Sequence, residues 1–199
     1  MGPSGSFTHT MQVFDDQRSC VAGVVRFLLD GLGAGDASLV VIRRDRWPLV
    51  ASELRSRNVP LVELFVTRRL VVQDAEEVLR LFRRDGRLDW AAFETAAGGL
   101  VDAVSPPGGR LRVYGEAVDV LAAEGDLDAA HALEELWNRL GERMSMELFC
   151  GYTAASFSHP RTVPALRAIC RAHSDVRAAS ADPLSAFILT ASAALNSFD

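Results

Sequence analysis

Short runs of β-branched residues alternate with amphipathic helical stretches along this chain of 199 residues. Residues 38–42 and 70–72 are continuous apolar runs, a pattern typical of strands buried on both faces of a parallel sheet. Residues 21–32 place their valines and leucines on a single helical stripe. Strands that alternate with helices imply βαβ units, whose crossovers are right-handed. We therefore predict an α/β fold with a mainly parallel sheet flanked by helices.

The predicted elements follow one another without an internal repeat or a change in composition that would mark a second domain. Strands are predicted at about 9–14, 38–42, 70–72, 111–114 and 146–149. Helices are predicted over 21–32, 47–57, 75–82, 90–104, 117–124 and 126–140, and from Pro160 onward. The strongest loop signal is the proline-glycine segment at 106–109.

Composition excludes several classes of protein. Hydrophobic residues make up 49% and charged residues 24% of the chain, as in ordinary globular proteins. A net charge of −5 without a long basic run argues against direct nucleic-acid binding. Apolar runs fall short of the ~20 residues that span a bilayer, and the start of the chain lacks a signal-peptide pattern. The three cysteines form no CxxC pair, so we expect a cytoplasmic protein with reduced thiols and no membrane contact.

The turn after the first predicted strand lacks a phosphate loop. A nucleotide-binding α/β domain usually opens with a strand, a glycine-rich turn and a helix, so that backbone N–H groups can approach the phosphates. Here the turn contains Asp15, Asp16 and Arg18, but neither glycine nor lysine. Two carboxylates stand where a phosphate would need positive potential. The turn therefore favours a sensor or binding module over an ATPase.

Polar residues gather where the predicted strands end. In an open parallel sheet, ligands bind beyond the carboxyl ends of the strands. Acids, arginines and one tyrosine follow the predicted strands, and a histidine begins the first of them. We predict a small-molecule site made by His9, Asp15, Arg46, Asp74, Glu116 and Tyr152.

The acidic residues of this set also have structural interpretations. Asp74 with Glu77 fits a helix capping box, and either Asp15 or Asp16 would cap the helix that follows. Glu116 stands in a first helical turn, where the helix dipole stabilises an anion by ~0.3–1 kcal/mol. These interpretations and ligand contact both remain open at this stage.

The other polar residues have similar alternatives. Of Arg43, Arg44 and Arg46, we expect two to be solvated. The ring of Tyr152 would pack with its hydroxyl hydrogen-bonded, and His9 would be a structural residue rather than a general base.

Catalytic and metal motifs are missing from the chain. It contains no Ser-His-Asp pattern, nucleophile elbow or HExxH motif, so we predict that it is not an enzyme. Cys170 and His173 form a C-x-x-H pair that could supply half of a metal site. A second pair at ligand spacing is lacking, since only Cys150 and His159 lie nearby in sequence. We therefore predict no metal and no other cofactor.

Several segments resemble a known family. They cover residues 112–118, 133–140, 149–152 and 169–176, with shorter matches at 9–15, 27–32 and 70–75. The first two read R-V-Y-G-E-A-V and L-E-E-L-W-N-R-L. Over about residues 9–177 the chain is similar to the MEDS domain, the methanogen/methylotroph DcmR-type sensory domain.

The resemblance implies a three-layer, RecA/KaiC-like fold without a working phosphate loop. It also implies a bacterial or archaeal sensor of small molecules such as hydrocarbon derivatives, which signals to a kinase or transcriptional regulator. This chain departs from the family pattern at Arg46, where the family commonly has histidine, and at Ala117, where it has methionine. Both departures make the predicted crevice more polar, so a purely apolar ligand is less expected.

We divide the chain into a flexible N-terminus (1–8), a sensory domain (9–177) and a C-terminal helical tail (178–199). We expect the apolar positions of the tail to pack on the domain itself. The alternative is that the tail serves self-association as a homodimer or docks an output protein.

Two other functions remain open. Arg18, Arg43 and Arg46 could hold phosphate from their side chains, which would make the chain a degenerate nucleotide-binding domain. The chain could instead be a pure protein-interaction scaffold for a kinase or transcriptional regulator. A scaffold predicts a closed strand-end surface and a large apolar patch elsewhere.

Overall fold

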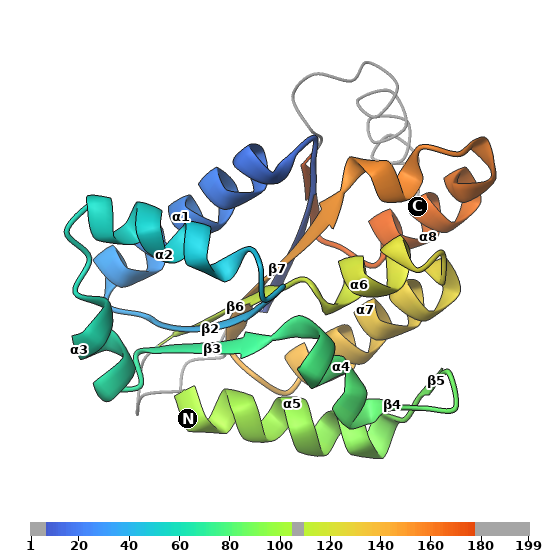
Figure 1. Cartoon of the computed structure of the whole chain (residues 1–199). Helices are drawn as coiled ribbons and strands as arrows, with labels where there is room; N and C mark the ends of the chain where they lie inside the picture. Colours follow the sequence, from blue (N-terminus) through green and yellow to red (C-terminus); the bar gives the residue numbers. More distant parts are fainter. Residues whose placement is uncertain (1–6, 105–109, 178–199) are drawn as a thin grey trace.

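The computed structural model describes residues 7–104 and 110–177. Its middle layer is a six-stranded sheet in the order β3-β2-β6-β7-β1-β8 (Figure 1). In that order the strands are Leu70–Asp74, Ala37–Ile42, Leu111–Gly115, Met146–Thr153, Thr8–Phe14 and Asp175–Arg177. All neighbouring pairs are parallel, which confirms the predicted mainly parallel sheet.

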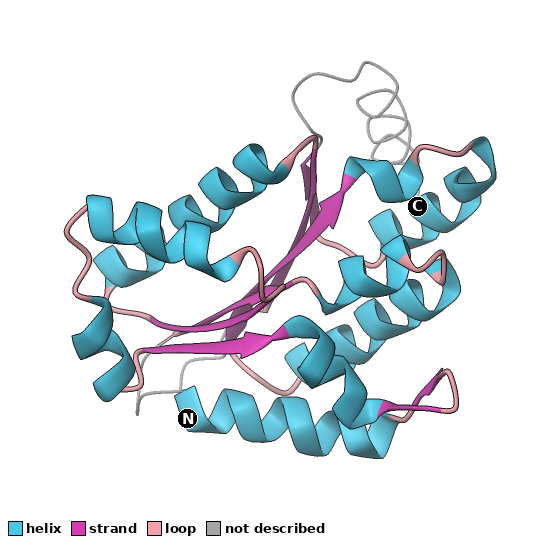
Figure 2. Ribbon diagram, in the orientation of Figure 1, coloured by secondary structure: helices cyan, strands magenta, loops and turns pink. Residues whose placement is uncertain are grey.

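Helices cover both faces of this sheet (Figure 2). One face carries α1 (Gln17–Ala34), α2 (Trp47–Ser56) and α3 (Leu61–Val66). The other carries α4 (Ala75–Phe82), α5 (Trp90–Val104), α6 (Ala117–Ala123), α7 (Leu127–Gly141) and α8 (Val163–Arg171). Two short 3-10 helices, η1 (Ala154–Phe157) and η2 (Pro160–Thr162), connect β7 to α8. The result is the three-layer α/β arrangement predicted from the sequence.

Successive residues of each strand enter opposite hydrophobic layers, because side chains alternate across a sheet. In β6, Val113 belongs to the core formed with α4 to α8, whereas Tyr114 belongs to the core formed with α1, α2 and α3. Val41 and Ile42 divide in the same way at the end of β2. Since both layers are buried, both faces of a central strand need apolar residues, which explains continuous runs such as 38–42 in the sequence.

The chain leaves the neighbouring strands β2 and β6 in opposite directions. After β2 it enters α2 on one face and continues to the edge strand β3. After β6 it enters α6 on the other face and continues to β7. The carboxyl ends of β2 and β6 therefore flank a topological switch point, which is where open α/β sheets bind ligands. The 43–46 loop and Glu116 lie at this point.

Two predicted helix caps are confirmed. Asp16 Oδ1 accepts a hydrogen bond from the Ser19 N–H at 2.7 Å, and the Asp16 N–H donates to Ser19 Oγ at 3.2 Å. Asp74 Oδ1 accepts from the Glu77 N–H at 2.9 Å. The turn before α1 is therefore a helix-capping turn, as its composition indicates.

The predicted helix from Pro160 onward is wrong where it reaches residues 175–177. Helix α8 ends at Arg171, and β8 then adds an edge strand beside β1. Only Val176 of β8 is apolar, so the strand has no hydrophobic run by which to predict it. Helix α3 and the hairpin of β4 (Arg83–Arg84) and β5 (Arg87–Leu88) were also not predicted. The predicted tail helix after residue 178 lies outside the described residues.

None of the helices within 7–104 and 110–177 combines the length and the apolar composition needed to cross a membrane.

Gly151 in β7 lets the ring of Tyr114 pass close to the strand. A Cβ at residue 151 would lie 2.4 Å from the Tyr114 hydroxyl and 3.2 Å from a ring carbon of Phe14. Both rings are buried, so neither can move aside easily. We expect Gly151→Ala to lower the free energy of unfolding, measured in urea, by about 1–3 kcal/mol through overpacking.

The matched control is Gly99→Ala on the exposed side of α5, where a new Cβ meets nothing within 4 Å. That substitution is expected to stabilise the protein by roughly 0.5–1 kcal/mol, because alanine is the better helix former. Equal effects at the two positions would mean that the close approach of Tyr114 to Gly151 does not limit the packing.

Candidate functional site

Glu116 follows β6 and is fully buried beneath the switch point. Its Oε1 accepts a hydrogen bond from the Tyr114 hydroxyl at 2.7 Å and lies 2.6 Å from Nη1 of Arg46. Its Oε2 accepts the backbone N–H of Arg43 at 2.9 Å. One cation, the Tyr114 hydroxyl, the Arg43 N–H and, at 3.6 Å, the Cys20 thiol thus surround the carboxylate, and Glu116 links the loop after β2 to the end of β6.

Asp119 on α6 makes a second ion pair beside the first. It is 1% exposed, and its Oδ2 accepts from Nε of Arg43 at 3.2 Å. Its Oδ1 accepts the Thr153 N–H at 2.8 Å, and its Oδ2 accepts the Thr153 hydroxyl at 3.1 Å. Sequence reasoning missed Asp119. The available signal was a lone acid within the otherwise apolar helix A-V-D-V-L-A-A.

The expectation that two of the three arginines are solvated is wrong. The side chain of Arg44 is 75% exposed, but those of Arg43 and Arg46 are only 22% and 13% exposed. Burial disfavours the charge on Arg46, but the facing carboxylate of Glu116 outweighs burial and raises the pKa of the guanidinium above its ordinary value. Nε of Arg46 is buried and has no hydrogen-bond partner among the described residues.

A cavity of about 370 Å³ opens beside these ion pairs. Its walls combine guanidinium, carboxylate and hydroxyl groups with small methyl groups. The lining residues are Arg43, Arg46, Asp119, Ala123, Thr153, Ala155 and Ser156. The volume falls within the range of roughly 300–1,000 Å³ typical of small-molecule sites. We call this the strand-end cavity.

Asp74 belongs to a neighbouring cavity. That cavity measures about 610 Å³ and is lined by Arg43, Arg44, Asp45, Asp74, Glu76 and Arg80. Burial alone would raise the pKa of Asp74, but the cap bond from Glu77 and the pair with Arg44 lower it below its ordinary value. Asp74 and Arg46, which were predicted to share one site, thus line two different cavities, both of which Arg43 also lines.

A larger groove of about 680 Å³ lies between α1 and α2. Its charged residues, which include Arg18 and Asp30, are exposed or half-buried, and Glu53 pairs there with Arg57. Because these side chains are solvated, their charged groups are not held in one arrangement before a ligand binds. We therefore place the candidate site at the strand-end cavity.

His9 and Tyr152 do not face the strand-end cavity but meet at Glu134 of α7. Tyr152 was expected beyond the last strand, but β7 includes it, and its hydroxyl donates to Glu134 Oε1 at 2.6 Å. Nε2 of His9 lies 3.2 Å from Glu134 Oε2, and Nε2 of His173 lies 3.3 Å from Oε1. Sγ of Cys150 donates to Glu134 Oε2 at 3.2 Å. We call these five residues the Glu134 cluster.

The Glu134 cluster is a buried ionic group. Burial opposes the charge of Glu134, but attraction from His173 and His9 outweighs burial and holds the pKa of the carboxyl well below its ordinary range. Burial would also lower the pKa of His173, yet the facing Glu134 raises it. Burial and the charge of Glu134 together raise the pKa of the Cys150 thiol.

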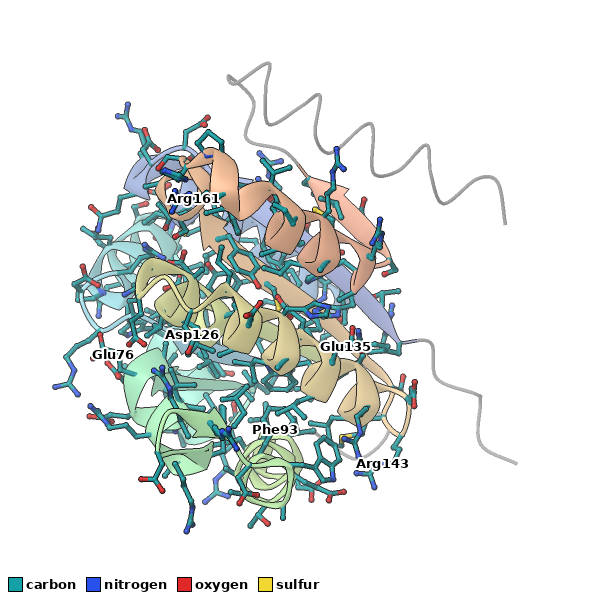
Figure 3. All side chains as sticks on the ribbon, turned by 90° about the vertical axis from the view of Figure 1, so that its right-hand side faces the viewer. Glu76, Phe93, Asp126, Glu135, Arg143 and Arg161 are labelled. Carbon is teal, nitrogen blue, oxygen red and sulfur yellow. The ribbon has the colours of Figure 1, made fainter. Side chains whose placement is uncertain are left out.

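Helix α7 supplies Glu134 from its buried face. Figure 3 shows this helix lying between the labels of Asp126 and Arg143, with Glu135, the neighbour of Glu134, labelled along it. Helical periodicity places position 134 on the same face as Leu133 and Trp137. Sequence reasoning missed Glu134, although a charged residue on an apolar helical stripe was a usable signal.

The remaining predicted residues belong neither to the strand-end cavity nor to the Glu134 cluster. Asp15 is exposed at the end of β1. Cys170, three residues before His173, is buried but is not among the possible metal ligands that surround Glu134.

A family model described as MEDS, "MEthanogen/methylotroph, DcmR Sensory domain", matches residues 8–174. The match spans the strand-end cavity and the Glu134 cluster. No curated protein matches the chain.

Proposed function

The chain belongs to the MEDS family of sensory domains, and from this premise we propose that it binds a small polar ligand in the strand-end cavity and relays binding to a partner protein. The ligand would contact Arg46, whose ion-pair partner Glu116 is buried beneath the switch point of the sheet. Residues of the 43–46 loop, α6, β7 and η1 meet there, so a ligand would touch several elements at once.

The observation that carries this proposal is the unpartnered Nε of Arg46, buried in a side chain that lines the cavity. A buried N–H without an acceptor costs about 1–3 kcal/mol. A ligand oxygen that accepts from this atom would recover that free energy on binding. The proposed ligand therefore carries an acceptor such as a carbonyl, a carboxylate or a hydroxyl group.

The neighbouring groups restrict the ligand further. Arg43 and Arg46 are already paired with Asp119 and Glu116, so the cavity has little net charge to offer a multiply charged anion. The hydroxyls of Thr153 and Ser156 add hydrogen-bonding capacity to the wall. A small molecule with mixed donors and acceptors suits this lining better than a pure hydrocarbon.

We further propose that the domain is not an enzyme and that it works in the cytoplasm. The thiol of Cys20 lies 3.6 Å from Glu116 Oε1. Burial, and then the charge of Glu116, raise the pKa of Cys20 to about 12, so little reactive thiolate forms near neutral pH. Cys20, Cys150 and Cys170 are free thiols, which suits a reducing compartment.

Signalling requires that the ligand bind one conformation better than another. Arg43 and Glu116 join the loop before α2 to the start of α6, on opposite faces of the sheet. A ligand that redirects these bonds would shift helices on both faces. We propose that a kinase or transcriptional regulator reads this shift. Val62 and Val66 of α3, which are 77% and 78% exposed, offer such a partner an apolar contact.

A thermal-shift screen tests the ligand-binding proposal. Small carboxylates, amides, alcohols, nucleotides and cyclic dinucleotides are each added to the full chain. A true ligand at 100 times its Kd stabilises by about 2.7 kcal/mol. For a domain of this size, that free energy raises Tm by roughly 5–10 °C.

The matched variants are Arg46→Lys and Arg44→Lys. Lysine at position 46 keeps the positive charge beside Glu116 but lacks the guanidinium Nε. The increase in Tm that a ligand causes should therefore be much smaller in Arg46→Lys. Arg44 is 75% exposed and pairs with Asp74, so Arg44→Lys should leave the ligand's shift unchanged. A screen without any stabilising compound, or a hit equally strong in Arg46→Lys, would contradict the proposed site.

The nucleotide alternative is less well supported. It requires Arg18, Arg43 and Arg46 to hold one phosphate, yet Arg18 lines the groove between α1 and α2 while the other two line the strand-end cavity. Calorimetry with ATP and cyclic dinucleotides would restore this alternative if it gave micromolar affinity.

A further inference from the structure

The Glu134 cluster brings together four groups that bind transition metals. His9 comes from β1, Glu134 from α7, Cys150 from β7, and His173 from the segment after α8. All four are buried, and one donor atom from each lies within 4.8 Å of the others. Segments far apart in sequence therefore converge on one buried point, which the C-x-x-H pattern at 170–173 does not indicate.

Hydrogen bonds set the orientation of both histidines. Nδ1 of His9 lies 2.8 Å from Oδ1 of Asn138, whose Nδ2 donates to the Ala172 carbonyl at 2.9 Å. That bond assigns Oδ1 as an acceptor, so the proton of His9 is on Nδ1. Nδ1 of His173 lies 2.7 Å from the Ile169 carbonyl, which can only accept. His173 therefore also carries a proton on Nδ1.

In both rings, Nε2 is thus the atom left free to bind something else. The two Nε2 atoms lie 3.2 and 3.3 Å from the two oxygens of Glu134. Nε2 of His173 is buried without a hydrogen-bond partner among the described residues, because its contact with Glu134 lacks hydrogen-bond geometry. A lone pair that faces a carboxylate is repelled unless a proton or a cation lies between them. Histidines that bind metals typically donate their other ring N–H to an oxygen acceptor, as Nδ1 of both rings does here.

The distances also fit a metal. His9 Nε2 to Cys150 Sγ is 3.3 Å, and Cys150 Sγ to Glu134 Oε2 is 3.2 Å. A tetrahedral Zn²⁺ site with bonds of about 2.0–2.3 Å has ligand atoms roughly 3.3–3.8 Å apart. These two pairs need to separate by only a few tenths of an ångström, and all four donor atoms lie within 4.8 Å of one another.

We propose that His9, Glu134, Cys150 and His173 bind one divalent transition-metal ion of the Zn²⁺ type. One carboxylate and one thiolate balance the two positive charges of the ion. On binding, the Cys150 thiol loses its proton and its sulfur binds the ion as a thiolate, and this proton and any proton on the Nε2 atoms are released to solvent. The sulfur and nitrogen donors select against Mg²⁺ and Ca²⁺, which prefer oxygen.

The surroundings suit a closed, four-ligand site. Asn138 and the Ile169 carbonyl orient the histidines, and the Tyr152 hydroxyl orients the carboxylate. Ser174 makes two hydrogen bonds to the backbone of His9. The Ser174 N–H donates to the His9 carbonyl at 2.8 Å, and the His9 N–H donates to Ser174 Oγ at 2.9 Å. This clamp keeps His173 next to His9, with their ring centroids 4.0 Å apart. Four protein ligands leave no open position for catalysis, so the ion would join β1, β7, α7 and the chain after α8.

Cobalt substitution tests the proposal on the full chain. The protein is purified, stripped with a chelator and titrated with Co²⁺. We expect one Co²⁺ per chain, intense visible bands of a tetrahedral site, and a near-ultraviolet band from thiolate-to-cobalt charge transfer. Zn²⁺ should displace the Co²⁺ and abolish the bands. Octahedral, weak bands without the thiolate band would overturn the proposal, and so would no binding at all.

Variants assign the ligands. Cys150→Ser should abolish the thiolate band and weaken Co²⁺ binding by more than about 100-fold, since loss of an outer-shell partner alone costs about 10–100-fold. Cys170→Ser and His131→Ala, on α8 and α7 outside the four ligands, should keep both bands. Loss of the thiolate band in Cys170→Ser with its retention in Cys150→Ser would overturn the assignment. Should Cys150→Ser fail to fold, the wild-type Co²⁺ titration, together with the Cys170→Ser and His131→Ala controls, still tests whether the chain binds a metal through a thiolate.

Discussion

Replacing Glu134 with alanine is expected to destabilise the metal-free domain by about 3–5 kcal/mol, the range for breaking a buried ionic group by removing one partner. The carboxylate is fully buried and accepts from Tyr152 and Cys150 while it faces both histidines. Its removal leaves these groups in a dry interior without an acceptor. Urea unfolding in the presence of a chelator measures the loss.

The neighbouring Glu135 offers a matched control. It lies on the same helix but is exposed, so Glu135→Ala should change the free energy of unfolding by less than about 0.5 kcal/mol. Tyr152→Phe should have an intermediate effect of about 1–2 kcal/mol, because it removes one hydrogen bond to a charged acceptor and keeps the ring. Similar losses for Glu134→Ala and Glu135→Ala would mean that the cluster contributes little to stability.

The sheet could be predicted because its strands are buried on both faces. The run at 38–42 has no polar face, and this distinguishes it from helical stretches with a 3.6-residue stripe. Strand β8 could not be predicted in this way. Its only apolar residue is Val176, and its place depends on backbone bonds between Ser174 and His9, which are 165 positions apart.

The candidate site was predictable in part for a similar reason. Arg46 and Glu116 each follow a parallel strand, and the carboxyl ends of parallel strands meet at one edge, so their proximity could be expected. Asp119 and Glu134 lie inside helices, and their contacts depend on how each helix is rotated against the sheet. His9 and Tyr152 share one face of neighbouring strands, but only the position of α7 makes Glu134 their common partner.

The Glu134 cluster and the ion pairs beside the strand-end cavity contact consecutive residues of β7. The Tyr152 hydroxyl donates to Glu134, and the next residue, Thr153, donates its N–H to Asp119. A change at the strand-end cavity therefore acts on the same stretch of backbone as the Glu134 cluster. An ion bound to the cluster would limit how far that stretch can move when a ligand enters.

Glu116→Ala is expected to lower the free energy of unfolding by about 3–5 kcal/mol, as much as Glu134→Ala, because it too removes one partner of a buried ionic group. The substitution removes the counterion of Arg46, whose side chain is only 13% exposed, and the acceptor of the Arg43 N–H and the Tyr114 hydroxyl. Urea unfolding again supplies the measurement. Arg44→Ala serves as control, since its exposed pairs with Asp74 and Glu77 should be worth no more than ~1 kcal/mol.

A double-mutant cycle shows whether the unpaired charge of Arg46 causes the loss of stability in Glu116→Ala. Glu116→Leu combined with Arg46→Met replaces the ion pair by apolar side chains, and such replacements of buried pairs are often near neutral. The double variant should therefore be more stable than the sum of the two single losses predicts, by about 0.5–3 kcal/mol. Strict additivity would mean that Arg46 finds another partner or water when Glu116 is absent. Its unpartnered Nε would then be a weak basis for a ligand site, so the cycle also tests the premise of the proposed sensor.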